Sequence, residues 1–217
     1  MTRTEPDDRP RGAARGTLAD WILRGRAEIL LASRSSRRRE LLERLGVPVR
    51  VVAAFAEERF PDGIEADEAV RRNAVAKAMS ARESGALGLL LAADTAVVVG
   101  PRVLGKPRDE ESARAMLSTL AGRAHVVLTG IALVDEEGTL LSGTESTEVE
   151  FRPLAPAEID EYVASGEPFD KAGAYGIQGL GALLVRGIRG DYTNVVGLPV
   201  GRLLDLARRL PRPARAR

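Results

Sequence analysis

A single acidic residue lies inside the most apolar stretch of the chain. Asp94 interrupts the aliphatic run 89–99, which is bounded by Gly88 and Gly100 and is typical of a buried strand. A buried carboxylate without a partner is costly, so such a group is usually paired, bound to a metal, protonated or used in chemistry. The alternative is that a bend exposes Asp94 at a strand end.

A lysine follows this strand at a distance that allows the chain to return. After the Gly100-Pro101 turn, residues 103–104 predict a short returning strand, and Lys106 comes next within Gly105-Lys106-Pro107. A hairpin here places the Lys106 ammonium beside the Asp94 carboxylate. The alternative places Lys106 on a solvated turn.

A basic cluster lies between the first predicted strand, at 28–33, and a helix that ends at Gly46. With Ser36 as its N-cap, three arginines fall in the first turn, where the helix dipole disfavours cations. A bound polyanion removes this conflict, because free N–H groups, serine hydroxyls and guanidinium groups together bind phosphate well. We therefore predict a phosphate site here, against the alternative of a solvated basic turn.

Other polar residues could complete a site. Glu58 belongs to a pair of acids that follows the predicted strand 49–52, a placement compatible with a divalent cation site. Lys77 lies at the edge of the small apolar stripe of a helix predicted from about 68 to 83 and capped by Asp67; it points to water or into a site. The chain has no cysteine and one histidine, so any metal requires oxygen ligands, which favours magnesium or manganese.

Glycine is concentrated near the C-terminal end. Eight of the 22 glycines fall between 166 and 197, and the segment 167–181 also carries Asp, Lys and Gln. Long irregular segments in compact domains tend to be functional, so we interpret this one as a binding loop. A strand over 182–188 and a helix ending near 210 follow it.

Composition predicts one domain at residues 27–210. The chain has 217 residues, of which 44% are hydrophobic, which is enough for a core. We expect residues 1–26 to be a disordered or loosely packed extension, apart from a short helix near Trp21, and residues 211–217 to be a basic tail. No apolar run is long enough to span a bilayer. We therefore expect a soluble cytoplasmic protein with no membrane or specific nucleic-acid partner.

Four ordered motifs resemble those of the Maf family of nucleotide pyrophosphatases. They are Leu-Ala-Ser-Arg-Ser-Ser-Arg-Arg at 31–38, Ala-Asp-Thr-Ala-Val at 93–97 with Gly-Lys-Pro at 105–107, Asp-Lys-Ala-Gly-Ala-Tyr-Gly-Ile-Gln-Gly at 170–179, and Asn-Val-Val-Gly-Leu-Pro at 194–199. The resemblance covers about residues 29–210. It implies an α/β fold, a twisted mixed sheet in two lobes flanked by helices, similar to inosine triphosphate pyrophosphatases. It also implies a homodimer, a divalent cation, and hydrolysis of a nucleoside triphosphate to the monophosphate and pyrophosphate.

The resemblance also assigns residues. It implies that Asp94 is the catalytic carboxylate, acting as general base or metal ligand, and that Glu58 and Asp94 bind the metal. Five residues would hold phosphates or order the site: Ser33, Arg37, Arg38, Lys77 and Lys106. The residues Arg37, Thr95 and Gln178 resemble the dTTP/UTP branch of the family, since the 7-methyl-GTP branch has Trp, Gln and Glu there.

Two positions depart from the family pattern, because Arg34 replaces a small residue and Ser36 replaces proline. Two alternatives to a dTTP/UTP pyrophosphatase stay open. One is a pyrophosphatase acting on 7-methyl-GTP or broadly on non-canonical nucleotides. The other is a nucleotide-binding regulator of septum formation.

Overall fold

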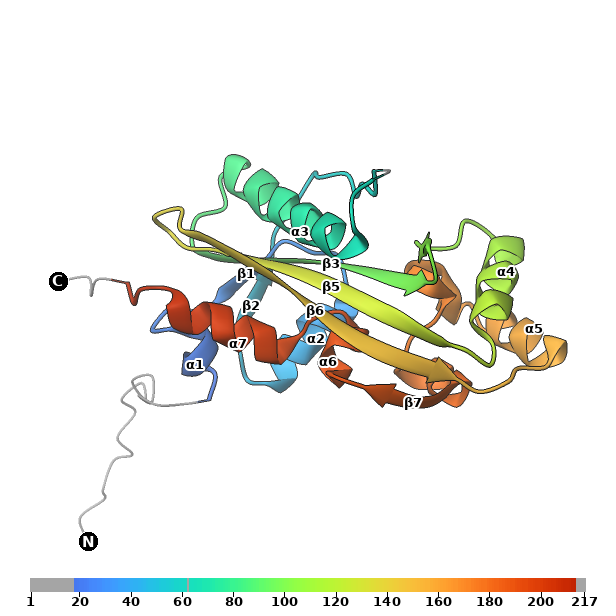
Figure 1. Ribbon diagram of the computed structural model, residues 1–217. Helices are drawn as coiled ribbons and strands as arrows, with labels where there is room; N and C mark the ends of the chain where they lie inside the picture. The colour runs from blue at the N-terminus through green and yellow to red at the C-terminus, as the bar shows by residue number, and fades with distance from the viewer. Residues whose placement is uncertain (1–17, 62, 214–217) are drawn as a thin grey trace, which may run out of the picture.

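A computed structural model describes residues 18–61 and 63–213, in which one mixed sheet has helices on both faces (Figure 1). Within these residues the sheet has seven strands in the order β2-β1-β3-β5-β6-β7, and β4 pairs with β3. The β1–β2 and β1–β3 pairs are parallel, and the other pairs are antiparallel. The strands are β1 (Ile29–Leu31), β2 (Val49–Val51), β3 (Leu89–Val99), β4 (Arg102–Leu104), β5 (Ala124–Val134), β6 (Leu140–Phe151) and β7 (Val185–Arg189).

The helices are distributed over the two halves of this sheet. In Figure 1, α3 covers one face, α1, α2 and α7 lie on the other, and α4 and α5 lie at the far end. The helices are α1 (Asp20–Leu23), α2 (Ser36–Arg44), α3 (Ala66–Glu83), α4 (Glu110–Leu120), α5 (Pro156–Ala164), α6 (Tyr192–Val196) and α7 (Val200–Arg209). Short 3-10 turns occupy much of the glycine-rich segment, at Glu167–Asp170, Ala172–Ala174 and Gly179–Leu184.

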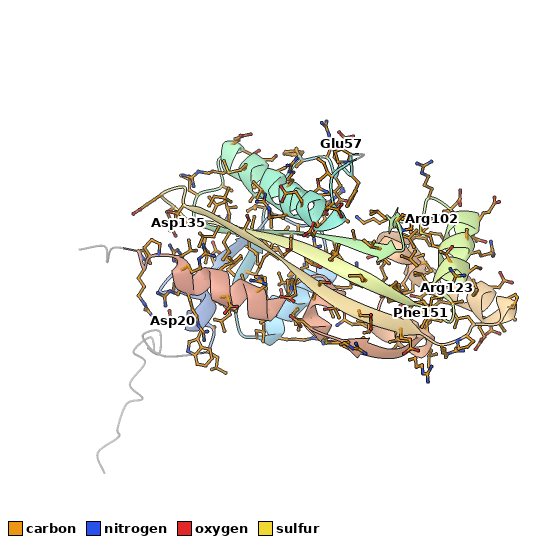
Figure 2. All side chains as sticks on the ribbon, in the orientation of Figure 1. Asp20, Glu57, Arg102, Arg123, Asp135 and Phe151 are labelled. Carbon is orange, nitrogen blue, oxygen red and sulfur yellow. The ribbon has the colours of Figure 1, made fainter. Side chains whose placement is uncertain are left out.

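Separate groups of buried side chains stabilise the two lobes. Around β1, one cluster lies under α1, α2 and α7, and another lies under the alanines of α3. At the far end, a third cluster joins α4, α5 and the glycine-rich segment. The strands β3, β5 and β6 run through both lobes; Asp135 and Phe151 mark the two ends of this region in Figure 2. The predicted two-lobed mixed sheet flanked by helices is confirmed.

The central strand β3 has an interrupted edge. β1 pairs with Leu89–Leu91 and β4 pairs with Val97–Val99, both on the edge opposite β5. Among the described residues, positions 92–96 of that edge therefore have no strand partner, and we call them the edge notch. Asp94 lies at its centre. The backbone N–H and C=O groups along the edge notch need hydrogen-bond partners from side chains or irregular backbone, because such groups are rarely left unpaired when buried.

A glycine brings α3 close to the sheet beside the notch. Gly130 on β5 lies directly opposite Asp94 in the ladder. A Cβ at Gly130 would lie 2.3 Å from the Val70 carbonyl oxygen of α3, so only glycine allows this approach. The resulting proximity brings polar side chains of α3 to the Asp94 carboxylate.

Two predicted helix caps are wrong by one or two residues. The N-cap of α2 is Ser35, whose Oγ accepts a hydrogen bond from the Arg38 N–H, and Ser36 is the first helical residue. The N-cap of α3 is Glu65, and Asp67 lies in the first turn, where its carboxylate accepts from the next backbone N–H. Several polar residues compete at each helix start, so the sequence does not single out the extended one.

The strand predicted at 182–188 starts later, because a 3-10 turn continues to Leu184 before β7 begins. The predicted short helix near Trp21 is present as α1, and its Ile22 and Leu23 are buried, while Trp21 is half exposed. The predictions for residues 1–17 and 214–217 lie outside the described residues. No described helix combines the length and apolarity required to cross a bilayer.

Replacing Gly130 with alanine is expected to destabilise the fold. The added methyl group meets backbone that cannot move without separating α3 from the sheet, and overpacking of this kind costs about 1–3 kcal/mol or more. Gly187→Ala is the matched control, because this strand glycine has no neighbour within 4 Å of an added Cβ. Urea unfolding of both variants checks the prediction, and equal stabilities would contradict it.

The buried His125 is expected to make stability depend on pH. Burial lowers its pKa from 6.5 to about 4, and its Nε2 lies 2.7 Å from the Tyr175 hydroxyl. Between these pH values the unfolded chain binds a proton that the folded chain does not. The free energy of unfolding therefore falls as pH decreases through this window, by roughly 3 kcal/mol in total.

Urea unfolding from pH 7 to pH 4 measures this effect against His125→Phe. Phenylalanine suits the site, because His125 already packs edge-on against Phe151 and Tyr175. The wild type should lose more stability on acidification than the variant, and parallel pH curves would show that His125 does not contribute.

Candidate functional site

A cavity of about 370 Å³ opens at the edge notch, and every site residue predicted from the sequence lines it. These residues are Ser33, Arg37, Arg38, Glu58, Lys77, Asp94, Thr95, Lys106 and Gln178. They come from the β1–α2 segment, the segment before α3, α3 itself, β3, the segment after β4, and the glycine-rich segment. The fold therefore brings together residues that are up to 145 positions apart in sequence.

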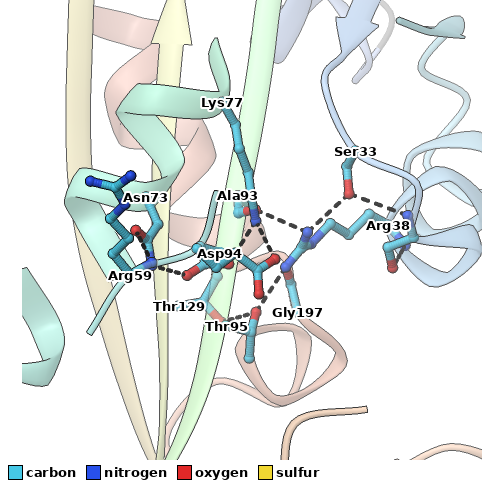
Figure 3. A network of polar contacts seen from close by, with 12 residues as sticks. Ser33, Arg38, Arg59, Asn73, Lys77, Ala93, Asp94, Thr95, Thr129 and Gly197 are labelled. Carbon is cyan, nitrogen blue, oxygen red and sulfur yellow. Dashed lines mark hydrogen bonds and ion pairs between the residues drawn. The ribbon is translucent and has the colours of Figure 1, made fainter. Parts of the chain in front are cut away.

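The Asp94 carboxylate is buried, with 2% of the residue exposed, and it has two side-chain donors on α3. Oδ1 accepts from Lys77 Nζ at 2.7 Å, and Oδ2 accepts from Asn73 Nδ2 at 2.8 Å (Figure 3). Lys77 Nζ also donates to Glu58 Oε1 at 2.7 Å. One ammonium thus joins the two carboxylates to which the family resemblance assigns metal binding.

Helical spacing explains why α3 supplies both donors. Asn73 and Lys77 are four residues apart, so their side chains lie one above the other on the same helix face. Asn73 is itself fixed, since its Oδ1 accepts from the Arg59 backbone N–H at 3.0 Å. The alternative in which Lys77 only reaches water is wrong, because its ammonium is mostly buried and paired.

Arg38 fills the other side of the edge notch. Its guanidinium donates to the carbonyls of Ala93 (3.0 Å) and Gly197 (2.7 Å), and to the hydroxyls of Ser33 (2.9 Å) and Thr95 (3.0 Å) (Figure 3). Burial lowers the Arg38 pKa, and the charges of Asp94 and Glu58 oppose that effect. Arginine remains cationic in proteins, so Arg38 is a fixed positive charge. It satisfies the exposed edge of β3 and orders the cavity wall.

The arginines at the start of α2 have partners within the protein. Arg38 turns to the β3 edge, Arg37 donates to the Asp170 carboxylate at 2.6 Å, and Arg39 lies 3.6 Å from a Glu43 oxygen. The conflict seen in the sequence is therefore relieved without a bound polyanion. Arg37 and Asp170 both line the cavity, so an anionic ligand there would meet Arg37 already oriented by a carboxylate.

Thr95 connects Arg38 to the second lobe. Its hydroxyl lies 3.0 Å from that of Thr129, which donates to the Asn194 carbonyl at 3.2 Å. The buried Asn194 amide donates to the Val127 carbonyl and to the Thr147 hydroxyl. The Thr95 side chain is therefore held in one orientation, and the cavity wall it forms is rigid.

Lys106 and Gln178 also line the cavity, and the charge of Lys106 affects the pKa of Glu58. Lys106 follows the β3–β4 hairpin as predicted and lines the cavity. Burial raises the pKa of Glu58, but the charge and hydrogen bond of Lys77 and the charge of Lys106 outweigh it and lower that pKa overall. Glu58 is therefore an anion at neutral pH. Gln178 lies in the cavity wall beside Gly176 and Ile177.

The charge of the cavity favours a polyanion. Six cationic side chains line it, against three acidic ones, and the cations come from both lobes: Arg34, Arg37, Arg38, Lys77, Lys106 and Lys171. In the described residues no group of three or more Asp, Glu, His or Cys side chains is placed to hold a metal ion.

Sequence reasoning missed several polar residues of this site. Asn73 could have been found, since it lies one turn before Lys77 on the same stripe. Thr129, Asn194 and the partnership of Asp170 with Arg37 depend on strand register and on contacts between distant segments. No local pattern indicates them.

Replacing Arg38 with lysine is expected to destabilise the protein. An ammonium cannot reach four acceptors in the directions that the guanidinium does, so buried carbonyls at Ala93 or Gly197 lose their donor, which costs at least about 2 kcal/mol. Arg39→Lys, the exposed neighbour on α2, is the control and should change stability by less than about 0.5 kcal/mol. Thermal unfolding of both variants tests this, and equal midpoints would contradict it.

Comparison with known proteins connects this cavity to a family. A dTTP/UTP pyrophosphatase of Halalkalibacterium halodurans is 49% identical over 80% of this chain and 91% of its own length. One from Anaeromyxobacter is 49% identical over 85% of this chain and 90% of its own length, and one from Bacillus cereus is 46% identical over 82% and 92%.

Among solved structures, a nucleoside-triphosphatase / dITP/XTP pyrophosphatase from Mycobacterium abscessus matches with a TM-score of 0.40 and 21% identity, over 57% of this chain and 74% of that one. The family model described as Maf-like protein matches residues 28–210, which contain every residue of the cavity. With relatives at nearly half identity across most of its length, the chain belongs to the Maf-like protein family.

Proposed function

We propose that this protein hydrolyses dTTP and UTP to the nucleoside monophosphate and pyrophosphate. The observation that carries the proposal is the buried Asp94 carboxylate at the wall of a cavity rich in cations. The curated relatives named dTTP/UTP pyrophosphatase support the same substrates. Arg37, Thr95 and Gln178, the three residues that resemble the dTTP/UTP branch, line this one cavity.

The cationic side chains divide into those that fix the wall around Asp94 and those that would contact the phosphates. Arg38 is committed to the edge notch and Lys77 to Asp94 and Glu58, so both supply positive potential from fixed positions. Arg37, which is paired with Asp170, and Lys106 also line the cavity and would contact the phosphates directly. Preorganised cations of this kind stabilise the charge that develops as a phosphoanhydride bond breaks.

The acids fit a divalent cation that the substrate helps to bind. Glu58 and Asp94 both accept hydrogen bonds from the Lys77 ammonium, so the two carboxylates lie close enough together to contact one cation. Magnesium is commonly held by one or two carboxylates together with substrate phosphates, so the absence of a third acid among the described residues suits this arrangement. When bound, magnesium or manganese would neutralise phosphate oxygens.

Asp94 is the residue we assign to water activation. Each carboxylate oxygen has two lone pairs, so the bonds from Asn73 and Lys77 leave acceptor capacity for a water. In the proposed step the water oxygen bonds to the α-phosphorus, its proton passes to Asp94, and the bond to the bridging oxygen breaks. Pyrophosphate leaves with the bonding electrons, next to Arg37 and Lys106.

Recognition of the base is assigned to Gln178 and Thr95. The Gln178 amide offers one donor and one acceptor, which suits the edge of uracil or thymine. Thr95, whose hydroxyl is held by Arg38 and Thr129, limits the size of the cavity. We also propose that the protein is a homodimer, which sedimentation velocity tests. The proposal places it in the cytoplasm.

Asp94→Asn is expected to lower turnover of dTTP by about 10²–10⁴-fold, because the amide cannot accept the proton of the attacking water. Pyrophosphate release with magnesium or manganese measures it, on a panel of dTTP, UTP, 7-methyl-GTP and inosine triphosphate. Asp205→Asn, on the exposed side of α7, is the control and should keep wild-type turnover.

Circular dichroism and thermal unfolding verify that the Asp94 variant is folded. Full activity in a folded Asp94→Asn protein would refute the role of Asp94. A wild type that prefers 7-methyl-GTP or inosine triphosphate would refute the proposed substrates, and a wild type inactive on the whole panel would favour a nucleotide-binding regulator.

A further inference from the structure

The segment that carries Gln178 is a closed loop. We call residues 176–181 the Gln178 loop. Its ends touch, since a Cβ on Gly181 would lie 2.0 Å from the Gly176 carbonyl oxygen. Gly176, Ile177 and Gln178 line the cavity, and the residues after Gln178 turn away from it. The position of Gln178 therefore depends on what holds the two ends of this loop.

One carboxylate outside the cavity wall holds the second half of the loop. Glu167 Oε2 accepts from the Leu180 N–H at 3.0 Å, and Oε1 accepts from the Gly181 N–H at 3.1 Å. These two N–H groups follow Gln178 by two and three residues. Hydrogen bonds to a charged acceptor are stronger than neutral ones, so this carboxylate is a firm anchor.

A buried tyrosine holds the first half and connects it to the same carboxylate. The Tyr162 hydroxyl, from α5, donates to Glu167 Oε1 at 2.9 Å and accepts from the Gly176 N–H at 3.2 Å. Tyr162 packs in the core of the far lobe. Burial raises its pKa, so the hydroxyl keeps the proton that it donates to Glu167. Both ends of the Gln178 loop are thus fixed on one Tyr162–Glu167 pair.

We propose that Glu167, supported by Tyr162, is a positioning residue that sets nucleobase discrimination by fixing the Gln178 loop against the cavity. The inference rests on the proposed function, because discrimination is meaningful only for a nucleotide substrate. Glu167 is not among the cavity-lining residues, so it acts on the substrate through Gln178. Asp94, Arg37 and Lys106 themselves lie on other elements, and Asp170, which orients Arg37, shares the 3-10 turn of Glu167.

The variant Glu167→Gln tests this. A carboxamide places an NH₂ group against one of the loop N–H donors, so one anchor is lost while the side chain keeps its size. We expect the ratio of kcat/KM for dTTP to that for CTP to fall about tenfold, mostly through a higher KM for dTTP, with kcat within about threefold. Glu161→Gln, exposed on α5 next to Tyr162, is the matched control and should leave the ratio unchanged.

A double-mutant cycle separates positioning from general destabilisation. If Glu167 acts through Gln178, then Glu167→Gln adds little to the loss of discrimination caused by Gln178→Ala. Additive effects, or wild-type discrimination in Glu167→Gln, would overturn the inference. Should Glu167→Gln fail to fold, Tyr162→Phe removes only the hydroxyl and is expected to lower the same ratio by a smaller factor.

Amide hydrogen exchange gives a readout that needs no activity. Glu167→Gln should speed exchange in a peptide covering residues 176–184 and leave β5 unchanged. Unchanged exchange in that peptide would also count against the inference. A wild type that hydrolyses none of the nucleotides refutes the proposed function, and the exchange result still decides whether Glu167 fixes the loop.

Discussion

The ion pair between Asp94 and Lys77 is the interaction that ties α3 to the central strand β3. Removing a carboxylate and an ammonium from water is expensive, and their attraction compensates only when both are well placed and fully hydrogen-bonded. Here Asn73 and Glu58 complete the set. Because Lys77 and Asn73 come from α3, the helix must lie unusually close to the sheet, and Gly130 opposite Asp94 permits it. The pair therefore requires α3 to lie close to the sheet, and this in turn requires glycine at position 130 of β5.

The edge notch is a gap in strand pairing at the middle of the central strand β3. An unpaired strand edge exposes N–H and C=O groups that normally recruit another strand. In this protein β1 and β4 each cover part of the β3 edge, and Arg38 donates to the Ala93 carbonyl between them. A charged side chain thus replaces a strand. The gap becomes a cavity wall with fixed positive potential.

Much of this architecture could be predicted from the sequence. The apolar run around Asp94 predicted β3 with its bounds, because a long aliphatic segment between glycines has few alternatives. The hairpin after β3 also follows from local chemistry, because a Gly-Pro turn separates the long strand from the short returning one. Seven of the nine predicted cavity-lining residues lie in the four ordered motifs; Glu58 was found from an acid pair after a strand and Lys77 from the stripe of its helix.

The rest required knowledge of the fold. The caps of α2 and α3 were misplaced because neighbouring polar residues compete for the same position. The bonds of Thr129 and Asn194, and the anchor at Glu167, join segments whose proximity follows from strand register and loop closure, which residue type alone does not encode. The partners of the arginines in the basic turn could not be predicted either, because Asp170 and the β3 carbonyl that they contact lie far away in sequence.

The hydrogen bond from Arg38 to the Gly197 carbonyl spans 159 residues. During synthesis the arginine leaves the ribosome long before its acceptor has been translated, so the nascent chain carries an incomplete wall until the C-terminal segment docks. Contacts of such sequence separation form late, because closing a long loop is entropically demanding. The wall of the cavity is therefore complete only once the segment that carries Gly197 has docked against Arg38.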